Sequence, residues 1–329
     1  MLSLEDLPVP TVEKQVDIGR ELVIPWIHRE LTLGTGFSSK LISTPDPWIT
    51  ARSPFNIDEL RKQRLLYDGK VEGRHNFRDA ESTSHSTGME HTSGSLGVAV
   101  GCSFLSASVT GSYDKTVLET KDTYSVSRTC LVRDGVIRFK AEPRLSYEAE
   151  KLLREPNGQA KFQEVYGDYY VSCYILGGDA GVYVATSDDT VDTKTKEKVT
   201  VKVKVLFFTA SKTFEKERST HDETFQVTMS GYDTLTNTCH GYPSKKEGLD
   251  KASQAQFNEV RRQSIGYLQN VDKLPFRVRE RMRELRLVND RDELEWSHCS
   301  DICQAGLVVQ VILMPYRYLR DYQIALYRN

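Results

Sequence analysis

Residues 162–185 (FQEVYGDYYVSCYILGGDAGVYVA) constrain the fold more than any other part of the 329-residue sequence. The first residues have a helical pattern that ends at Tyr166-Gly167, and an apolar strand pattern follows. Nearly every position of residues 169–176 is apolar, as in a strand that is covered on both faces. Gly177-Gly178 then frees the backbone to bend or twist. We therefore expect a short helix that leads into a buried strand with a diglycine at its end.

Four other strand patterns accompany this unit in the chain. Residues 93–109 contain alternating bulky and small residues, and residues 129–139 form another apolar run. In residues 199–208 valine alternates with threonine and lysine. Residues 225–232 have a further strand pattern, which contains Gly231 near its end. The sequence therefore predicts long strands separated by polar segments that are able to change structure.

The remaining patterns predict helices and loops. Residues 74–92 are polar and have no period, so we expect a loop there. Residues 146–166 predict a helix, a break at Pro156-Asn157-Gly158 and a second helix. Helical periodicity over residues 245–271 and 275–288 precedes a last apolar strand at residues 306–314.

Composition indicates a soluble globular protein with no strong overall electric field. Apolar residues make up 39%, charged residues 27%, and the net charge is −2, which argues against a nucleic-acid partner. No run approaches 18 apolar residues, and the N-terminus lacks the pattern of a signal peptide. We expect a protein that is cytoplasmic or released by a non-classical route.

The sequence offers no pattern for catalysis, a cofactor or a metal. It contains no Gly-x-Ser-x-Gly, no phosphate-binding glycine loop, no dinucleotide fingerprint and no His-Glu-x-x-His. Cys299 and Cys303 have helical spacing, but with Cys239-His240 they do not form a known zinc-finger spacing. The six cysteines show no disulfide framework, so we expect free thiols. We expect a protein that is not an enzyme, although a site without a recognisable motif stays an alternative.

The strand order and several local motifs resemble the membrane attack complex/perforin (MACPF) superfamily. Tyr166-Gly167-Asp168-Tyr169-Tyr170 stands where that family has Tyr-Gly-Thr-His-Phe, and Leu176-Gly177-Gly178 matches its Leu-Gly-Gly. Ser230-Gly231-Tyr232-Asp233 is similar to the stretch that closes the fourth core strand, and Leu313-Met314-Pro315 is similar to the closing Leu-Pro stretch. The resemblance covers residues 90–325 and is to a short leaderless member, such as a fungal one. Asp168 and Tyr169 depart from the family motif, and the polar segments are short.

This resemblance implies an α+β fold with a bent and twisted four-stranded antiparallel central sheet, flanked by helices and two convertible segments. Residues 1–90 would be an irregular or helical N-terminal segment packed on the core, and residues 91–329 the MACPF-like domain. The implied protein is a monomer in solution that assembles into a homo-oligomer on a lipid membrane, with a protein partner or receptor as a further option. Hairpins from about residues 109–128 and 186–218 would insert into the lipid.

Residues 199–207 satisfy the length and alternation of a membrane-spanning strand, which needs ~9–11 residues. One face would carry the membrane-inserting side chains Val199, Val201, Val203, Val205 and Phe207, and the other Thr200, Lys202 and Lys204. Lys212, Lys216 and Arg218 form a basic cluster suited to anionic headgroups. The alternative is an ordinary amphipathic strand in a soluble, non-lytic binding or scaffold protein.

Two further interpretations stay open at the motif residues. Gly177, Gly178 and Gly231 fit either a hinge that opens during insertion or a bulge at a strand end. We expect residues Tyr166, Gly167 and Tyr170 to form a structural joint rather than a ligand site.

Overall fold

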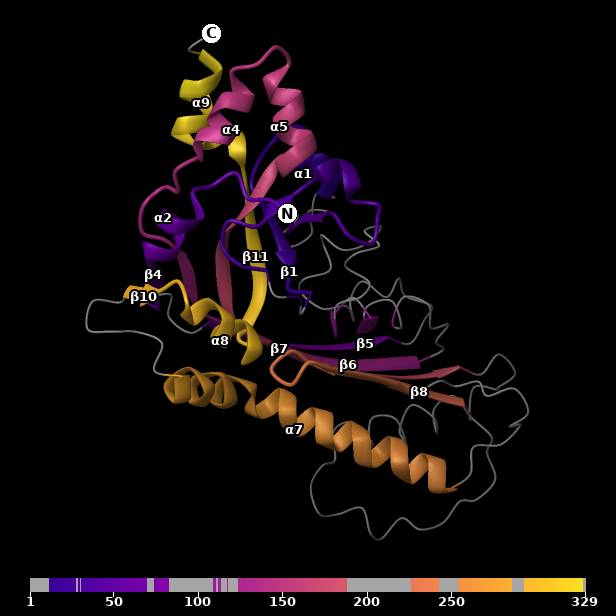
Figure 1. Ribbon diagram of the computed structural model, residues 1–329. Coiled ribbons are helices and arrows are strands. Elements are labelled where there is room, and N and C mark those ends of the chain that lie inside the picture. Colours follow the sequence, from indigo (N-terminus) through magenta and orange to yellow (C-terminus); the bar gives the residue numbers. More distant parts are fainter. Residues whose placement is uncertain are drawn as a thin grey trace, which may run out of the picture.

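One antiparallel sheet organises the protein, and the computed structural model shows that sheet bent into two halves (Figure 1). The structure describes residues 12–27, 29, 31–69, 74–82, 109–110, 112–113, 117, 124–187, 226–242, 254–285 and 293–327. Eleven strands of this described part belong to the sheet, and every pairing among them is antiparallel. The fold is therefore a mixed α/β architecture around a large antiparallel sheet.

Two long central strands, β6 (Tyr124–Phe139) and β7 (Tyr169–Ser187), run through both halves of the sheet. The upper half adds β1 (Leu22–Pro25), β2 (Gly36–Phe37), β3 (Trp48–Ile49), β4 (Arg64–Asp68), β10 (Glu293–Glu295) and β11 (Val308–Pro315). The lower half adds β5 (Arg74–Ser82), β8 (Gln226–Asp233) and β9 (Thr238–Tyr242). Figure 1 shows the upper strands upright and the lower strands lying across them.

Both central strands change neighbours at the same level. β7 pairs with β11 through residues 169–176 and with β8 through residues 180–187. β6 pairs with β5 through residues 125–133 and with β4 through residues 136–139. We call the level where these neighbours change, residues 133–136 of β6 and 176–180 of β7, the bend.

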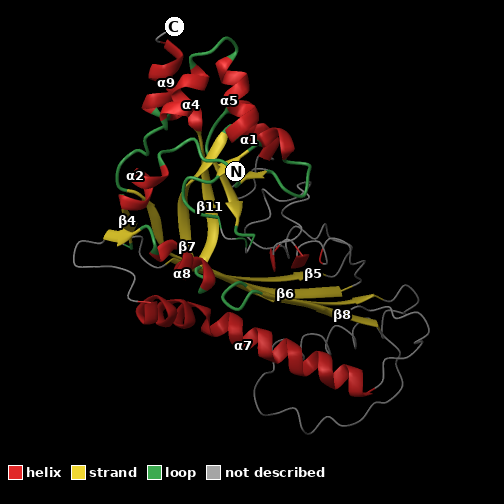
Figure 2. Ribbon diagram, viewed as in Figure 1, coloured by secondary structure: helices red, strands yellow, loops and turns green. Residues whose placement is uncertain are grey.

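Helices cover the upper end and one face of the lower half, as Figure 2 shows. The helices α4 (Tyr147–Leu153), α5 (Gly158–Tyr166) and α9 (Arg320–Tyr327) lie at the upper end. α7 (Gln254–Leu285) runs along the lower half. The shorter helices are α1 (Val12–Ile18), α2 (Ile57–Lys62), α8 (His298–Gln304), η2 (Ser39–Leu41) and η6 (Tyr316–Tyr318).

Alternation along the strands gives the lower half two buried faces. Val182 and Val184 of β7 pack with Tyr267 and Leu268 of α7. Tyr183, one position along, belongs to a second cluster on the opposite face of the sheet. The lower half is therefore covered on both sides, which explains the nearly continuous apolar sequence of β7.

Several predicted elements are confirmed. The strands predicted at residues 129–139, 169–176 and 225–232 are present as β6, β7 and β8, and the last strand at 306–314 is β11. The helix–loop–helix predicted over residues 146–166 is α4 and α5.

Other predictions were wrong. The predicted four-stranded sheet is a sheet of eleven strands, and β7 continues past the diglycine to Ser187 instead of ending there. Residues 74–82 form β5, not a loop; the side chains of 75–79 are all exposed, so this strand has no apolar period to reveal it. The two helices predicted around Pro275 are one helix, α7, which contains this proline.

The first 90 residues are more regular than expected. This segment, predicted to be irregular or helical, contributes strands β1 to β5 to the sheet. The division of the chain at residue 90 stays a prediction. The strands predicted within residues 93–108 and 199–208 lie outside the described residues, as does Cys102.

Candidate functional site at the bend of the sheet

Gly177 occupies the bend because a neighbouring backbone leaves no room for a side chain. A Cβ atom on Gly177 would lie 1.9 Å from the carbonyl oxygen of Val132, and the φ angle of Gly177 is +157°. The register between β6 and β7 also shifts here, between Arg133 and Gly135. Such a shift marks a β-bulge whose extra residue, Asp134, lies on β6 opposite Leu176 and Gly177, and the hinge and bulge interpretations of the diglycine both stay predictions.

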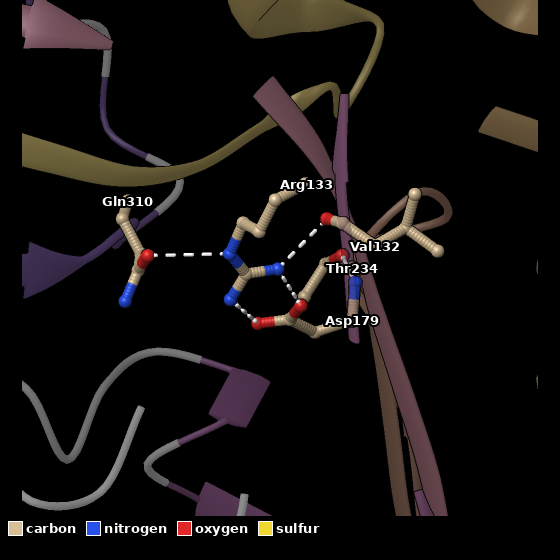
Figure 3. Close-up of polar contacts among 5 residues, drawn as sticks. All are labelled: Val132, Arg133, Asp179, Thr234 and Gln310. Atoms are coloured by element: carbon tan, nitrogen blue, oxygen red, sulfur yellow. Dashed lines mark hydrogen bonds and ion pairs between the residues drawn. The ribbon is translucent and has the colours of Figure 1, made fainter. Parts of the chain in front are cut away.

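A buried ion pair ties β6 to β7 at the bend (Figure 3). The guanidinium of Arg133 donates two hydrogen bonds to the carboxylate of Asp179: Nη1 to Oδ1, and Nη2 to Oδ2 at 3.0 Å. The Asp179 side chain is 1% exposed and that of Arg133 22%. Burial alone would lower the pKa of Arg133, but the attraction of Asp179 outweighs it and raises that pKa. The Arg133 guanidinium is therefore held in its charged form.

The same arginine reaches the upper half of the sheet. Its Nε donates to Oε1 of Gln310 in β11 at 3.3 Å, and its Nη1 donates to the carbonyl oxygen of Val132 at 2.9 Å. The backbone N–H of Asp179 in turn donates to the hydroxyl of Thr234, just after β8, at 2.8 Å. The network thus joins strands of the upper half to the chain that follows β8 in the lower half.

A second buried carboxylate fastens α7 to the sheet. Arg277 Nη1 donates to Oδ2 of Asp233 at 2.6 Å, and the backbone N–H of Leu235 donates to Oδ1 at 3.0 Å. The Asp233 side chain is fully buried. Asp233 pairs with Ala180, the residue after Asp179, so the two carboxylates come from neighbouring positions of adjacent strands but point to opposite faces of the sheet.

Glycines let α7 pack closely on the sheet. A Cβ atom on Gly231 would lie 2.5 Å from the ring of Tyr267, and one on Gly178 would lie 2.9 Å from Cγ2 of Val278. Arg128 of β6 adds a partly exposed ion pair with Asp272 of α7, at 3.0 Å. The structure therefore brings two predicted hinge residues, Gly178 and Gly231, together beneath α7.

Helical residues from the first convertible segment cover the opposite face of the sheet. Val109, Tyr113 and Val117 are all helical and buried, at a spacing of four that places them on one side of a helix. They pack with Tyr183, Ala185 and Tyr232, and the rings of Tyr113 and Tyr232 lie 4.6 Å apart between centroids. The described residues of this prediction between 109 and 117 are thus helical, whereas its residues 124–128 belong to β6.

The remaining signature residues lie at the other end of β7, away from the bend. Tyr166 is the last residue of α5, and Gly167 follows it with a φ angle of +82° and no room for a Cβ beside the backbone of Phe37. Tyr170 stacks on Tyr316, with centroids 5.1 Å apart, and burial raises its pKa. These side chains are part of the core and are not brought together with Gly177, Gly178 and Gly231.

Both long linking segments leave the lower half of the sheet at the same end. Ser82, the last residue of β5, pairs with Ser125 near the start of β6. Ser187, the last residue of β7, pairs with Gln226 at the start of β8, while Tyr124 pairs with Thr186. The chains that connect β5 to β6 and β7 to β8 therefore start side by side (Figure 1).

Several predicted residues cannot be placed. The membrane-inserting side chains and the basic cluster all lie outside the described residues: Val199, Val201, Val203, Val205, Phe207, Lys212, Lys216 and Arg218. The predicted hairpins and headgroup contacts therefore stay predictions.

Sequence reasoning missed the ion pairs at the bend. Arg133, Asp179, Asp233 and Arg277 come from four different elements, and no short motif connects them. One signal was present: Asp179 is a charge within an apolar run, and a charge in a buried strand needs a partner.

Possible metal ligands and thiols of the described residues lie apart from these contacts or are buried. They contain no group of three or more histidine, cysteine, aspartate or glutamate residues that could hold a metal. Cys130, Cys173, Cys239, Cys299 and Cys303 are free thiols, and burial raises the pKa of Cys130, Cys173 and Cys299 to about 12. Within the same part of the chain, no helix has the length and apolar character needed to cross a membrane.

Comparison with known proteins gives structural neighbours only. No family model and no curated protein matches the sequence. Similar solved structures include pneumolysin, at 8% identity and a TM-score of 0.34, over 91% of this chain and 61% of that one. A cell invasion protein with a MAC/Perforin domain from Bacteroides thetaiotaomicron has 10% identity and a TM-score of 0.25, over 84% and 66%. GNIP1Aa from Chromobacterium piscinae has 13% identity and a TM-score of 0.26, over 75% and 50%.

The chain thus spans between half and two thirds of the length of these three solved chains. The neighbours include proteins of the MACPF and pneumolysin kind. Because the TM-scores are low, we draw no functional inference from them.

Proposed function

We propose that this protein perturbs membranes by assembling on lipid and inserting β-hairpins, and that its action is physical rather than catalytic. The observation that carries the proposal is the shared exit of the two linking segments from the lower half of the sheet. In the proposed state, each segment extends the strand pair from which it leaves. Both hairpins then point in one direction and continue the existing register.

The physical basis is the hydrogen bonding of the backbone in lipid. Hydrocarbon offers no partners for N–H and C=O groups, so a spanning structure must pair all of them internally. Strands β5 to β8 already pair in sequence order, and their extensions would pair in the same way. Each linking segment is long enough for two strands of the ~9–11 residues that a membrane requires. A ring of copies would close the sheet and remove its edges.

The soluble state must release two layers before the hairpins can form. One layer is the helical part around Tyr113, which packs on Tyr232 and Tyr183. The other is α7, which Arg277 and Asp233 join to the sheet. In this proposal the side chains Val199, Val201, Val203, Val205 and Phe207 face lipid, while Lys212, Lys216 and Arg218 contact headgroups.

Dye release from liposomes tests the proposal. The wild-type chain should release dye, and Val201→Asp or Val203→Asp should abolish the release while the protein stays soluble and folded. Thr200→Asp is the matched control, because it adds the same charge at the position predicted to face water and should retain release. If the valine variants release dye as the wild type does, this strand does not face lipid.

A soluble binding or scaffold protein that does not insert is the second candidate. Two buried arginine–carboxylate pairs at the bend favour it, because they hold the lower half of the sheet in its bent state. This candidate predicts neither dye release nor ring-shaped assemblies by electron microscopy on any lipid mixture.

A further inference from the structure

The outward side of α7 differs in character from the side that packs on the sheet. Val271, Leu274 and Val278 are fully buried on the inner side. On the opposite side Phe276 is 61% exposed. Phe276 therefore contributes to a surface and not to the core.

Cations surround this exposed ring. Lys273 lies one helical turn before Phe276 and Arg283 two turns after it, so both share its side of the helix. Both are exposed, and neither forms an ion pair with another described residue. Arg279, one turn after Phe276, adds a third exposed cation on this side, and Asp272 and Glu280 are acidic residues on the same side. Asp272 pairs with Arg128 of the sheet, whereas Arg277 pairs with Asp233.

We propose that this outward side of α7, the surface formed by Lys273, Phe276 and Arg283, binds the surface of anionic phospholipid membranes. The chemistry fits a surface contact: an aromatic ring enters the boundary between headgroups and acyl chains, and cations attract the anionic headgroups. The inference rests on the proposed function and deepens it by naming the lipid and the contact. Because α7 covers the bend, the contact would lie directly over the part of the sheet that must open.

The test measures binding separately from leakage. The full chain is floated with vesicles of phosphatidylcholine alone or with about a third phosphatidylserine. We expect binding to the anionic vesicles that weakens as salt rises. Lys273→Glu with Arg283→Glu should lower partitioning at least about thirtyfold, since each cation contributes about fivefold near an anionic surface. Arg20→Glu with Lys62→Glu is the charge-matched control, at exposed positions outside α7, and should bind nearly as well as the wild type.

A second variant reports the site of contact directly. Phe276→Trp should show a blue-shifted emission with anionic vesicles and quenching by lipids that carry a nitroxide near the headgroup. The proposal is overturned if the tryptophan emission stays unchanged, if both charge variants lose binding equally, or if the face proves to be a contact between copies of the chain, with Arg283→Glu dissociating a dimer in solution.

The two proposals fail in different ways. Binding through α7 without any dye release would support the docking surface and contradict pore formation. Dye release that is insensitive to Lys273→Glu with Arg283→Glu would leave pore formation in place and reject this docking surface.

Discussion

At the residue scale, the bend depends on charges that are almost removed from water. A buried ion pair is not strongly stabilising in itself, but the loss of one partner leaves the other charge without compensation. Asp179 is the more sensitive partner, because its side chain is 1% exposed while Arg133 keeps some access to solvent.

We expect Arg133→Ala to lower the free energy of unfolding by about 3–5 kcal/mol, because Asp179 would stay buried with its charge uncompensated. Arg64→Ala is the matched control: Arg64 pairs with Glu295 at 2.8 Å and is half-exposed, so we expect a loss of less than about 1 kcal/mol. Urea unfolding followed by circular dichroism measures both. Equal losses in the two variants would contradict the importance assigned to the pair at the bend.

At the element scale, α7 packs closely on the sheet because Gly178 and Gly231 have no side chains that would push it away. Gly231→Ala would place a Cβ atom against the ring of Tyr267, so we expect a loss of about 1–3 kcal/mol from overpacking. Gly266 lies in α7 with no atom within 4 Å of the position that a Cβ would take, and Gly266→Ala should instead stabilise by about 0.5–1 kcal/mol through helix propensity. Thermal unfolding distinguishes the two signs, and a stabilising Gly231→Ala would reject close packing at this point.

The elements also show what the sequence could and could not predict. β6, β7 and β8 were predictable because their apolar residues are buried and periodic. β5 was not, because an exposed edge strand is polar on every side. Pro275 suggested a helix break, but tertiary packing of Leu274 and Val278 against the sheet maintains one helix through it. The ion pairs depend on contacts between distant residues, which a linear pattern does not encode.

At the scale of the whole molecule, buried phenols and thiols predict a limit of stability at alkaline pH. Burial raises the pKa of Tyr169, Tyr267 and Tyr322 from 10.0 to about 12, and that of Cys130, Cys173 and Cys299 from 9.0 to about 12. Such groups stay protonated in the folded state while the unfolded chain ionises. Their contribution to stability is therefore complete below pH 9 and is lost as the pH rises towards 12.

We expect the urea midpoint to be constant from about pH 7 to pH 8 and to fall steadily from about pH 9 to pH 11.5. The urea midpoint of Tyr322→Phe should fall less steeply with pH than that of the wild type, because this variant lacks one of the ionising groups. Parallel slopes for the two proteins would show that this tyrosine does not contribute to the alkaline transition.

The uninterrupted course of β6 and β7 through the bend determines where resistance to straightening is concentrated. Their mutual hydrogen bonds extend from Tyr124–Thr186 to Arg138–Cys173, on both sides of the corner. A rotation of one half of the sheet relative to the other can keep most of these hydrogen bonds between β6 and β7. The energetic barrier to straightening therefore depends on the few side chains that link the two halves at the bend. Arg133 is such a side chain, because it binds Asp179 of β7 and also Gln310 of β11 in the upper half, so the loss of this one residue should make the bend easier to deform.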